Sequence, residues 1–419
     1  MRHHVASLFP AVVCLSLCQL FLVAPPGNAA EPQLTEPEKI DLFEAGLEGY
    51  GQYRIPGIVV TKNGVVLAYC EARRNASTDW GQIDILLRRS TDGGHTWSPR
   101  KKIVELEGKF TRNPAAVAQK LGKEGELTVN NPLAIVDPRP GVVHFLYCVE
   151  YNRLFYMRSE DDGLSFSKPL EITAAVEKLR PSYDWQSFAV GPGHGIRLQN
   201  GRLIAAIWLS TGKGGHAHRP SIVTTIYSDD DGKTWQLGDT IANETKPLVN
   251  PSESILLELA SGEVMTNIRS ESPEHRRAVA VSPDGSTNWT EPKFHEQLIE
   301  PICMANLIRW TSAKDGDKNR IVFSNPHNLE RANAKPGQGR DRKNLSLKLS
   351  YDEGKTWPIN KTLEAGPSAY SDLAIAADRT LLCFYERTNT DEVSKKRTSF
   401  LTVARVTLPW LTAGKDKLP

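Results

Sequence analysis

An eight-residue motif recurs five times along the chain and limits its fold more than any other feature. Each copy starts with Ser, has Asp at its third position and ends on an aromatic residue, and four copies have Gly at the fifth position. The copies are Ser90–Trp97, Ser159–Phe166, Ser228–Trp235, Ser282–Trp289 and Ser350–Trp357. Because they recur every 54 to 69 residues, the sequence predicts a propeller, a solenoid or another repeat array.

The chemistry of the motif is typical of a hairpin turn. Its Ser and Asp side chains can accept hydrogen bonds from local backbone N–H groups, and its Gly tolerates a positive φ. The aromatic residue then returns as the first large side chain of the next strand. Strand-like runs precede three copies, at Ile83–Arg89, Ser221–Tyr227 and Leu345–Leu349. Similar short runs alternate with turns to the end of the chain, so the sequence predicts an all-β fold.

The first thirty residues have the pattern of a secretory signal peptide. A short basic start precedes a mostly apolar run from Val5 to Ala24, and small residues follow at positions 28–30. An uncleaved membrane anchor is the alternative, but proline and polar residues interrupt the apolar run. The sequence therefore predicts export, to the periplasm or out of the cell, with residues 31–41 as a polar linker.

The remaining 389 residues suit one large domain, predicted for residues 42–419. Six units of about 65 residues would account for them, within the usual range of β-propellers.

The formal net charge of +2 does not favour nucleic acid as a partner, and short basic runs such as Lys395–Arg397 are interpreted as solvated turns. The chain has no Cys-x-x-Cys pair, the pattern that would indicate a metal or redox site, so no metal or cofactor is expected. Four widely spaced cysteines are predicted to be buried free thiols, with disulfides, which export permits, as the alternative: Cys70, Cys148, Cys303 and Cys383.

The repeated motif resembles the Asp-box (BNR repeat) of bacterial-type exo-sialidases, or neuraminidases, of glycoside hydrolase family 33. The resemblance covers residues 53–386, and the fourth copy departs from it by having Ser286 where Gly is usual. It implies a six-bladed β-propeller in which the boxes are structural. It also implies an exo-α-sialidase that hydrolyses terminal sialic acids from glycoproteins, glycolipids and oligosaccharides with retention of configuration, acting as a monomer without stable membrane insertion.

Three arginines match the family's motifs for binding the substrate carboxylate. Arg54 lies in a Tyr-Arg-Ile-Pro stretch, Arg269 in Asn-Ile-Arg-Ser, and Arg342 just ahead of the last box. Arg340 remains an alternative to Arg342, whereas residues 276–277 are interpreted as ordinary turn arginines. Planar guanidinium groups suit this task because they bind carboxylates bidentately and stay charged at any working pH.

The resemblance assigns catalysis to three further residues. Asp79, in the loop after Glu71, matches the general acid/base; Asp84 is the alternative, but it alternates into a strand. Tyr370, within Ala-Tyr-Ser-Asp-Leu, matches the nucleophile, and Glu253 matches the glutamate that activates it. Two further residues have supporting roles: Arg73 would contact the substrate carboxylate, and Glu386 would hold Arg54.

Two other stretches near these motifs receive less direct roles. The Gly-rich segment around His194 is similar to a family segment beside the cleft, and His194 is interpreted as a structural hydrogen-bonding residue because no Ser or Cys nucleophile motif accompanies it. Asn131–Pro132 resembles a loop that lines the family's acyl-group pocket.

Two alternatives to a hydrolytic sialidase remain open at this point. A non-catalytic Asp-box protein that binds glycans or proteins would need the boxes alone, whereas this chain also has the arginine, aspartate, glutamate and tyrosine motifs. An enzyme of the same fold that acts on another nonulosonic acid, or that transfers or cyclises sialic acid, would share all of them.

Overall fold

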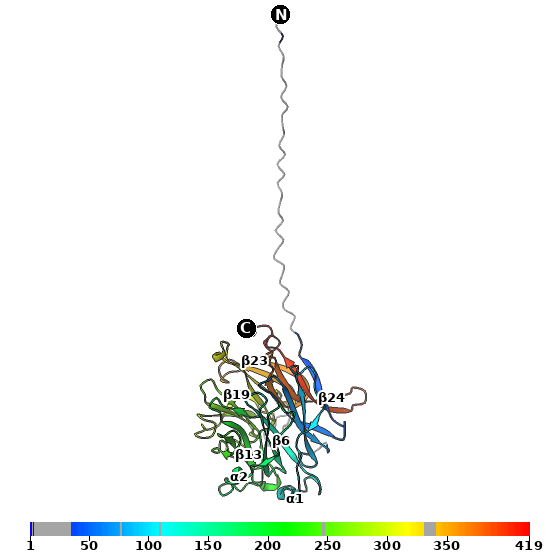
Figure 1. Ribbon diagram of the computed structural model, residues 1–419, viewed down its shortest axis with the longest axis vertical. Helices are drawn as coiled ribbons and strands as arrows, with labels where there is room; N and C mark the ends of the chain where they lie inside the picture. Colours follow the sequence, from blue (N-terminus) through cyan, green and yellow to red (C-terminus); the bar gives the residue numbers. More distant parts are fainter. Residues whose placement is uncertain (2, 4–34, 76–77, 109, 245–247, 331–340) are drawn as a thin grey trace. The chain divides into compact units, whose positions relative to one another are not determined.

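The computed structural model describes residues 1, 3, 35–75, 78–108, 110–244, 248–330 and 341–419. The chain divides into two units, Met1–Gln33 and Leu34–Pro419, and all named helices and strands belong to the second unit (Figure 1). This unit is built almost entirely of β-sheets, which confirms the predicted all-β class. Except for residues 1 and 3, the predicted signal peptide lies outside the described residues. Within the described ranges, no helix is both long and apolar enough to cross a membrane.

Four of the sheets contain four or five strands, and their pairing is antiparallel except where β11 joins β6. One sheet comprises β2 (Gln52–Val60), β3 (Val66–Arg73), β4 (Ile83–Ser90) and β5 (Lys101–Lys102). The next comprises β11 (Gly193–His194), β6 (Val129–Val136), β7 (Val143–Val149), β8 (Arg153–Ser159) and β9 (Leu170–Glu171). A third comprises β10 (Ser187–Val190), β12 (Ile196–Arg197), β13 (Leu203–Ser210), β14 (Ser221–Ser228) and β15 (Gln236–Leu237). A fourth comprises β16 (Ser254–Glu258), β17 (Val264–Ile268), β18 (Arg276–Ser282) and β19 (Lys293–Ile299).

The last sheet has seven strands and depends on one long strand. Its order is β1 (Glu38–Glu44), β25 (Arg397–Val406), β24 (Leu381–Thr390), β23 (Ile359–Ile375), β22 (Lys343–Ser350), β21 (Arg320–Pro326) and β20 (Asn306–Thr311). The first part of β23, up to Pro367, pairs with β22, whereas the part from Ser368 onward pairs with β24. Neighbouring sheets contact one another through β2 and β6, β13 and β16, β16 and β20, and β23 and β2.

Each box forms the turn that leads from one strand to the next strand of the same sheet. In the third copy, Ser228 Oγ accepts from the Gly232 N–H at 2.9 Å, and Asp230 Oδ1 accepts from the Thr234 N–H at 2.8 Å. Gly232 has a φ of +85°, and a Cβ there would lie 2.4 Å from the Tyr156 hydroxyl, so only Gly fits. These contacts confirm the turn that the sequence predicts.

The degenerate fourth copy closes the same kind of turn with one residue fewer. Ser282 Oγ accepts from the Gly285 N–H at 2.9 Å, and Gly285 has the positive φ of +76°. Asp284 Oδ1 accepts from the Ser286 and Thr287 N–H groups. Gly285 therefore supplies the N–H donor and the positive φ that the fifth-position Gly supplies in the other copies, one position earlier.

A short helix, α1 (Pro114–Ala118), lies between β5 and β6, with Asn113 capping its N-terminus. Two expectations about local structure need correction. Strand β1 begins at Glu38, inside the predicted linker 31–41, because residues 38–44 pair with β25. Arg276 and Arg277 are not turn residues, because both lie on β18, and Arg277 is fully buried 2.5 Å from Glu300.

Other short helices lie between strands or follow the last one. Between strands lie α2 (Ala174–Glu177) and two 3-10 turns, η1 (Lys213–Gly215) and η2 (Ala313–Asp315), and α3 (Leu408–Thr412) follows β25. The core consists of apolar side chains packed between sheets, as where Trp357 of the last box contacts Phe323 at a ring separation of 5.7 Å. The four cysteines outside the first unit are buried and free, as predicted.

Candidate active site

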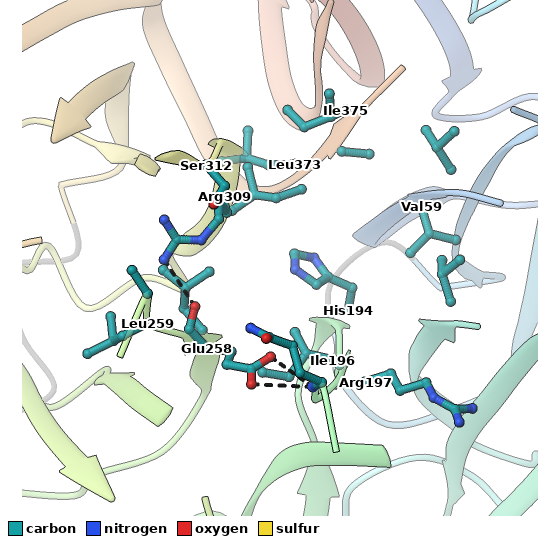
Figure 2. A pocket seen from close by; sticks show the side chains of 18 of the residues that line it. Val59, His194, Ile196, Arg197, Glu258, Leu259, Arg309, Ser312, Leu373 and Ile375 are labelled. Carbon is teal, nitrogen blue, oxygen red and sulfur yellow. Dashed lines mark hydrogen bonds between the residues drawn. The ribbon is translucent and has the colours of Figure 1, made fainter. Parts of the chain in front are cut away.

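Two cavities lie toward opposite ends of the same central strands. The larger, of about 650 Å³, is lined by the later residues of β2 and β23, such as Ile58 and Leu373, and by His194 (Figure 2). The smaller, of about 140 Å³, is lined by earlier residues of the same strands, including Arg54 and Tyr370. All six residues predicted to bind the substrate carboxylate or to catalyse line the smaller cavity: Arg54, Asp79, Glu253, Arg269, Arg342 and Tyr370.

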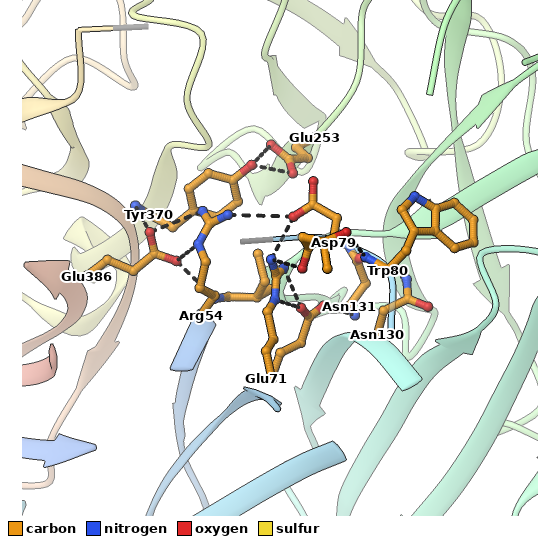
Figure 3. A network of polar contacts seen from close by, with 12 residues as sticks. Arg54, Glu71, Asp79, Trp80, Asn130, Asn131, Glu253, Tyr370 and Glu386 are labelled. Carbon is orange, nitrogen blue, oxygen red and sulfur yellow. Dashed lines mark hydrogen bonds and ion pairs between the residues drawn. The ribbon is translucent and has the colours of Figure 1, made fainter. Parts of the chain in front are cut away.

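Tyr370 and Glu253 form a direct pair at this smaller cavity (Figure 3). The Tyr370 hydroxyl donates to the Glu253 carboxylate, with Oη at 2.6 Å from Oε1 and 2.7 Å from Oε2. Burial raises the pKa of Tyr370, and the Glu253 charge adds to that rise although Arg269 opposes it. Burial alone would raise the pKa of Glu253, but Arg269 and the Tyr370 hydroxyl hold it below its ordinary value. Glu253 is therefore an ionised acceptor placed on a protonated phenol.

The three predicted arginines surround the Tyr370 side chain. The guanidinium carbons of Arg54 and Arg342 lie 4.9 and 5.2 Å from its ring centroid. Arg269 donates from Nη1 to the Tyr370 hydroxyl at 2.9 Å and forms an ion pair with Glu253. Three guanidinium groups, which stay charged at any working pH, therefore lie close together in this part of the cavity.

A local backbone irregularity sets the position of Arg54. The register of β2 against β3 shifts between Arg54 and Gly57, and Ile55 has a φ of +58°, which re-aims the neighbouring side chain as bulges do. Glu386 fixes the result: it accepts from Arg54 Nε at 3.0 Å, from Nη2 at 3.2 Å and from the Ile55 N–H at 3.1 Å. This is the holding contact that the sequence predicts for Glu386.

Asp79 lies at the mouth of the cavity, held by two arginines. Its Oδ1 accepts from Arg73 Nη1 at 2.7 Å and lies 3.7 Å from Arg54 Nη1, while 48% of the side chain is exposed. Burial of the carboxyl would raise its pKa, but Arg73 and Arg54 hold the pKa of Asp79 well below its ordinary value. Arg73 is itself fixed by Glu71 at 2.6 Å, so it positions Asp79. The alternative, Asp84, is buried on β4 beside Tyr50 and Lys102 and does not line the cavity.

One wall of the cavity consists of rings that the sequence analysis did not single out. His218 lies 4.8 Å from Tyr151 and 5.1 Å from Trp208, measured between ring centroids. Burial lowers the pKa of His218 to about 4, so the wall is uncharged near neutral pH. No local motif surrounds these three residues, and only the fold brings them together. Asn131 also lines the cavity, but it lies within β6 at a shift of the strand register rather than in the predicted loop.

Two remaining predicted residues have simple outcomes. His194 Nδ1 lies 2.7 Å from Asp372 Oδ1, which fits the predicted structural hydrogen bond and places it away from Tyr370. Arg340, the alternative to Arg342, lies outside the described residues.

One cluster of side chains has the composition of a metal site. Asp137, His144 and Asp231 bring potential ligand atoms within 4.8 Å of one another. Their carboxylates, however, already pair with Arg139, which bridges both, and with Arg197. The charges are balanced within the protein, so the cluster is an ion-pair network that joins two neighbouring sheets.

Comparison with known proteins identifies the chain's relatives. Residues 69–383 match the family described as BNR repeat-like domain. A sialidase of Micromonospora viridifaciens is 30% identical over 86% of this chain, and one of Bacteroides fragilis is 29% identical over 83%. The chain spans only 53% and 62% of the length of these two relatives. Human sialidase-3 is 28% identical, with 80% of this chain and 85% of the relative covered.

Solved structures similar to this chain include a sialidase and an intramolecular trans-sialidase. A Hadza microbial sialidase has a TM-score of 0.70 and 26% identity, covering 89% of this chain and 69% of that structure. The intramolecular trans-sialidase of Ruminococcus gnavus has a TM-score of 0.68 with 88% of this chain and 98% of that one covered, but its 16% identity shows a common fold alone.

Proposed function

The chain belongs to the family of proteins with a BNR repeat-like domain, and from this premise we propose that it is a retaining exo-α-sialidase. Its substrates are terminal α-linked sialic acids on glycoproteins, glycolipids and oligosaccharides. The observation that carries the proposal is the Tyr370–Glu253 hydrogen bond at 2.6 Å beneath three arginines. A scaffold that only binds glycans has no use for an ionised acceptor placed on a buried phenol.

The arginines bind the substrate first. The carboxylate of a sialic acid is attached to its anomeric carbon. When Arg54, Arg269 and Arg342 bind that carboxylate, the anomeric carbon lies beside the Tyr370 side chain. The same carboxylate would repel an attacking Asp or Glu, which is why a neutral phenol suits this sugar; sialidases are an exception to the rule of two carboxylates. A phenol has an ordinary pKa of about 10 and needs a base as it attacks.

The chemistry proceeds in two displacements. Tyr370 Oη attacks the anomeric carbon and passes its proton to Glu253, while the glycosidic C–O bond breaks and Asp79 gives a proton to the departing oxygen. A sialosyl–tyrosine intermediate results. Water then attacks the same carbon, Asp79 takes its proton, and Tyr370 leaves and recovers its proton from Glu253. Two inversions give net retention.

The proposal includes a six-bladed β-propeller for the second unit. Dividing β23 at Pro367 and Ser368, where its pairing changes from β22 to β24, turns the seven-stranded sheet into two runs of four strands. Together with the other four sheets these make six blades. The contacts of β2 with both β6 and β23 support a closed ring, with the candidate site on its axis.

The remaining parts of the proposal concern the chain's setting. Residues 1–30 act as a secretory signal, the mature enzyme is secreted or periplasmic, and it works as a monomer without membrane insertion. The apolar run between Val5 and Ala24 supports the signal.

Product analysis tests the proposed function. Purified protein is incubated with α2,3-, α2,6- and α2,8-linked sialosides, and the released sugar is identified by NMR. Free sialic acid appearing first as the α-anomer is expected. Release of an anhydro sugar or transfer to an acceptor would replace hydrolysis by another reaction of this fold, and absence of any release would favour the non-catalytic binding protein.

A further inference from the structure

Besides the catalytic cavity, Asp79 lines a second cavity, of about 380 Å³, which is distinct from the larger cavity of Figure 2. It shares Arg54, Arg73, Asp79 and Arg342 with the catalytic cavity, and its far wall consists of residues from β24 and β25, including Arg397 and Phe400. Neither Tyr370 nor Glu253 lines it. Asp79 therefore stands between two spaces, with the nucleophile on one side only.

The lining of this second cavity is strongly basic, with five arginines against the carboxylates of Asp79 and Glu386. Most of these arginines have a fixed partner; Arg387, for example, pairs with Asp41 at 2.6 Å. Arg397 differs. It is exposed at the start of β25, and among the described residues no carboxylate lies within ion-pair distance of it. Its charge is thus available to a ligand.

The direction in which a leaving group departs follows from the proposed function, on which this inference rests. In a displacement the nucleophile and the leaving group lie on opposite sides of the reacting carbon, and the acid lies beside the leaving oxygen. Tyr370 lines the first cavity only, and half-exposed Asp79 lines both, so a leaving group beside Asp79 can extend into the second cavity.

We propose that the second cavity is a leaving-group site selective for an anionic sugar, whose carboxylate or sulfate pairs with Arg397. The preferred substrates are then sialosides whose penultimate sugar is itself acidic, such as another sialic acid or a sulfated hexose. Phe400, over which Arg387 lies at 4.7 Å, offers an apolar surface to the body of that sugar.

The test compares selectivity in two variants of the same hairpin. The ratio of kcat/KM for an anionic substrate to that for neutral 3′-sialyllactose is measured with an α2,8-disialoside and, separately, with a sulfated sialoside. In Arg397→Ala the ratio is expected to fall roughly two- to fivefold, the range of a partly exposed ion pair, and added salt should shrink the wild-type ratio. Lys396→Ala, which removes the adjacent exposed charge outside the cavity, should keep the wild-type ratio.

Each outcome decides between specific alternatives. A loss with the disialoside alone, or with the sulfated sugar alone, supports the site and identifies its ligand as carboxylate or sulfate. An unchanged ratio in Arg397→Ala, or equal loss in both variants, overturns the site while leaving the sialidase proposal intact. Failure to release sialic acid from 3′-sialyllactose as well as from the anionic substrates would count against the proposed function itself, and the leaving-group site would fall with it.

Discussion

Asp79 shows how much of a residue's role depends on neighbours that are remote in the sequence. Its position in the loop, its candidacy as the acid and the support from Arg73 were all predictable from local motifs. Its electrostatics were not, because Arg54 reaches it from another strand. The two arginines favour the ionised form in the free protein, yet a general acid must be protonated to act.

The pH dependence of catalysis should therefore differ between free and substrate-bound enzyme. A general acid loses activity as pH rises through its pKa, and the pKa of Asp79 is lowered in the free protein. A substrate carboxylate bound to Arg54 offsets that positive charge and raises the pKa again. We expect the alkaline limb of kcat, measured on 3′-sialyllactose, to lie at higher pH than that of kcat/KM.

Asp79→Asn provides the matched control for this prediction. It should remove the alkaline limb and reduce turnover of 3′-sialyllactose far more than that of an aryl sialoside, whose phenol leaves without a proton. Equal damage to both substrates would contradict the acid role.

At the scale of elements, the boxes are the part of the fold that the sequence predicts best. A turn is a local structure, and Ser, Asp and Gly specify it by contacts within a few residues. Strand pairing over long distances is not local, so the 17 residues of β23 and their division between two partners could not be read from the sequence. Arg277 was misread for the same reason, since only the register of β18 turns it inward against Glu300.

The box tryptophans should differ in their contribution to stability according to burial. Trp235 is 5% exposed, whereas Trp97 is only partly buried. Trp235→Ala should lower the free energy of unfolding by roughly 3–5 kcal/mol, and Trp97→Ala by clearly less, as measured by denaturant unfolding. The folded fraction of each should keep its KM. A selective loss of substrate affinity with unchanged stability would mean that the boxes bind substrate.

A buried lysine on β22 should make stability depend on pH. Lys348 is 2% exposed, and its Nζ donates to Asn325 Oδ1 at 3.3 Å; burial lowers its pKa from 10.5 to about 7. Between these two values the unfolded chain holds a proton that the folded chain lacks, so this group makes stability rise with pH across that window. Lys348→Met should remove that rise and stabilise the protein at pH 7 by roughly 2–4 kcal/mol.

The measurement for this prediction is urea unfolding at several pH values from 7 to 10. Lys355→Met, at an exposed position of the last box, is the matched control and should change neither the slope nor the stability at pH 7 appreciably. A pH dependence in Lys348→Met equal to that of the wild type would show that the lysine is charged in the folded state as well as in the unfolded state.

At the scale of the whole molecule, the fold gathers residues that are hundreds of positions apart. Arg54 and Glu386 meet although 332 residues separate them, and Glu253 reaches Tyr370 across 117. The sequence could predict these residues singly, because each lies in a recognisable short motif. It could not predict the wall around His218 or the second cavity, because those depend on which loops the packing of the sheets brings together.

Covalent trapping tests the central claim, that Tyr370 is the nucleophile, most directly. The protein is treated with a 2,3-difluorinated sialosyl donor, whose fluorine slows both displacements but whose leaving group favours the first, and the labelled peptide is sequenced by mass spectrometry. The account predicts one sialosyl group per chain on Tyr370, absent in Tyr370→Phe and blocked by a competing substrate. A label on Glu253 or Asp79, or unlabelled protein that still hydrolyses sialosides, would contradict it.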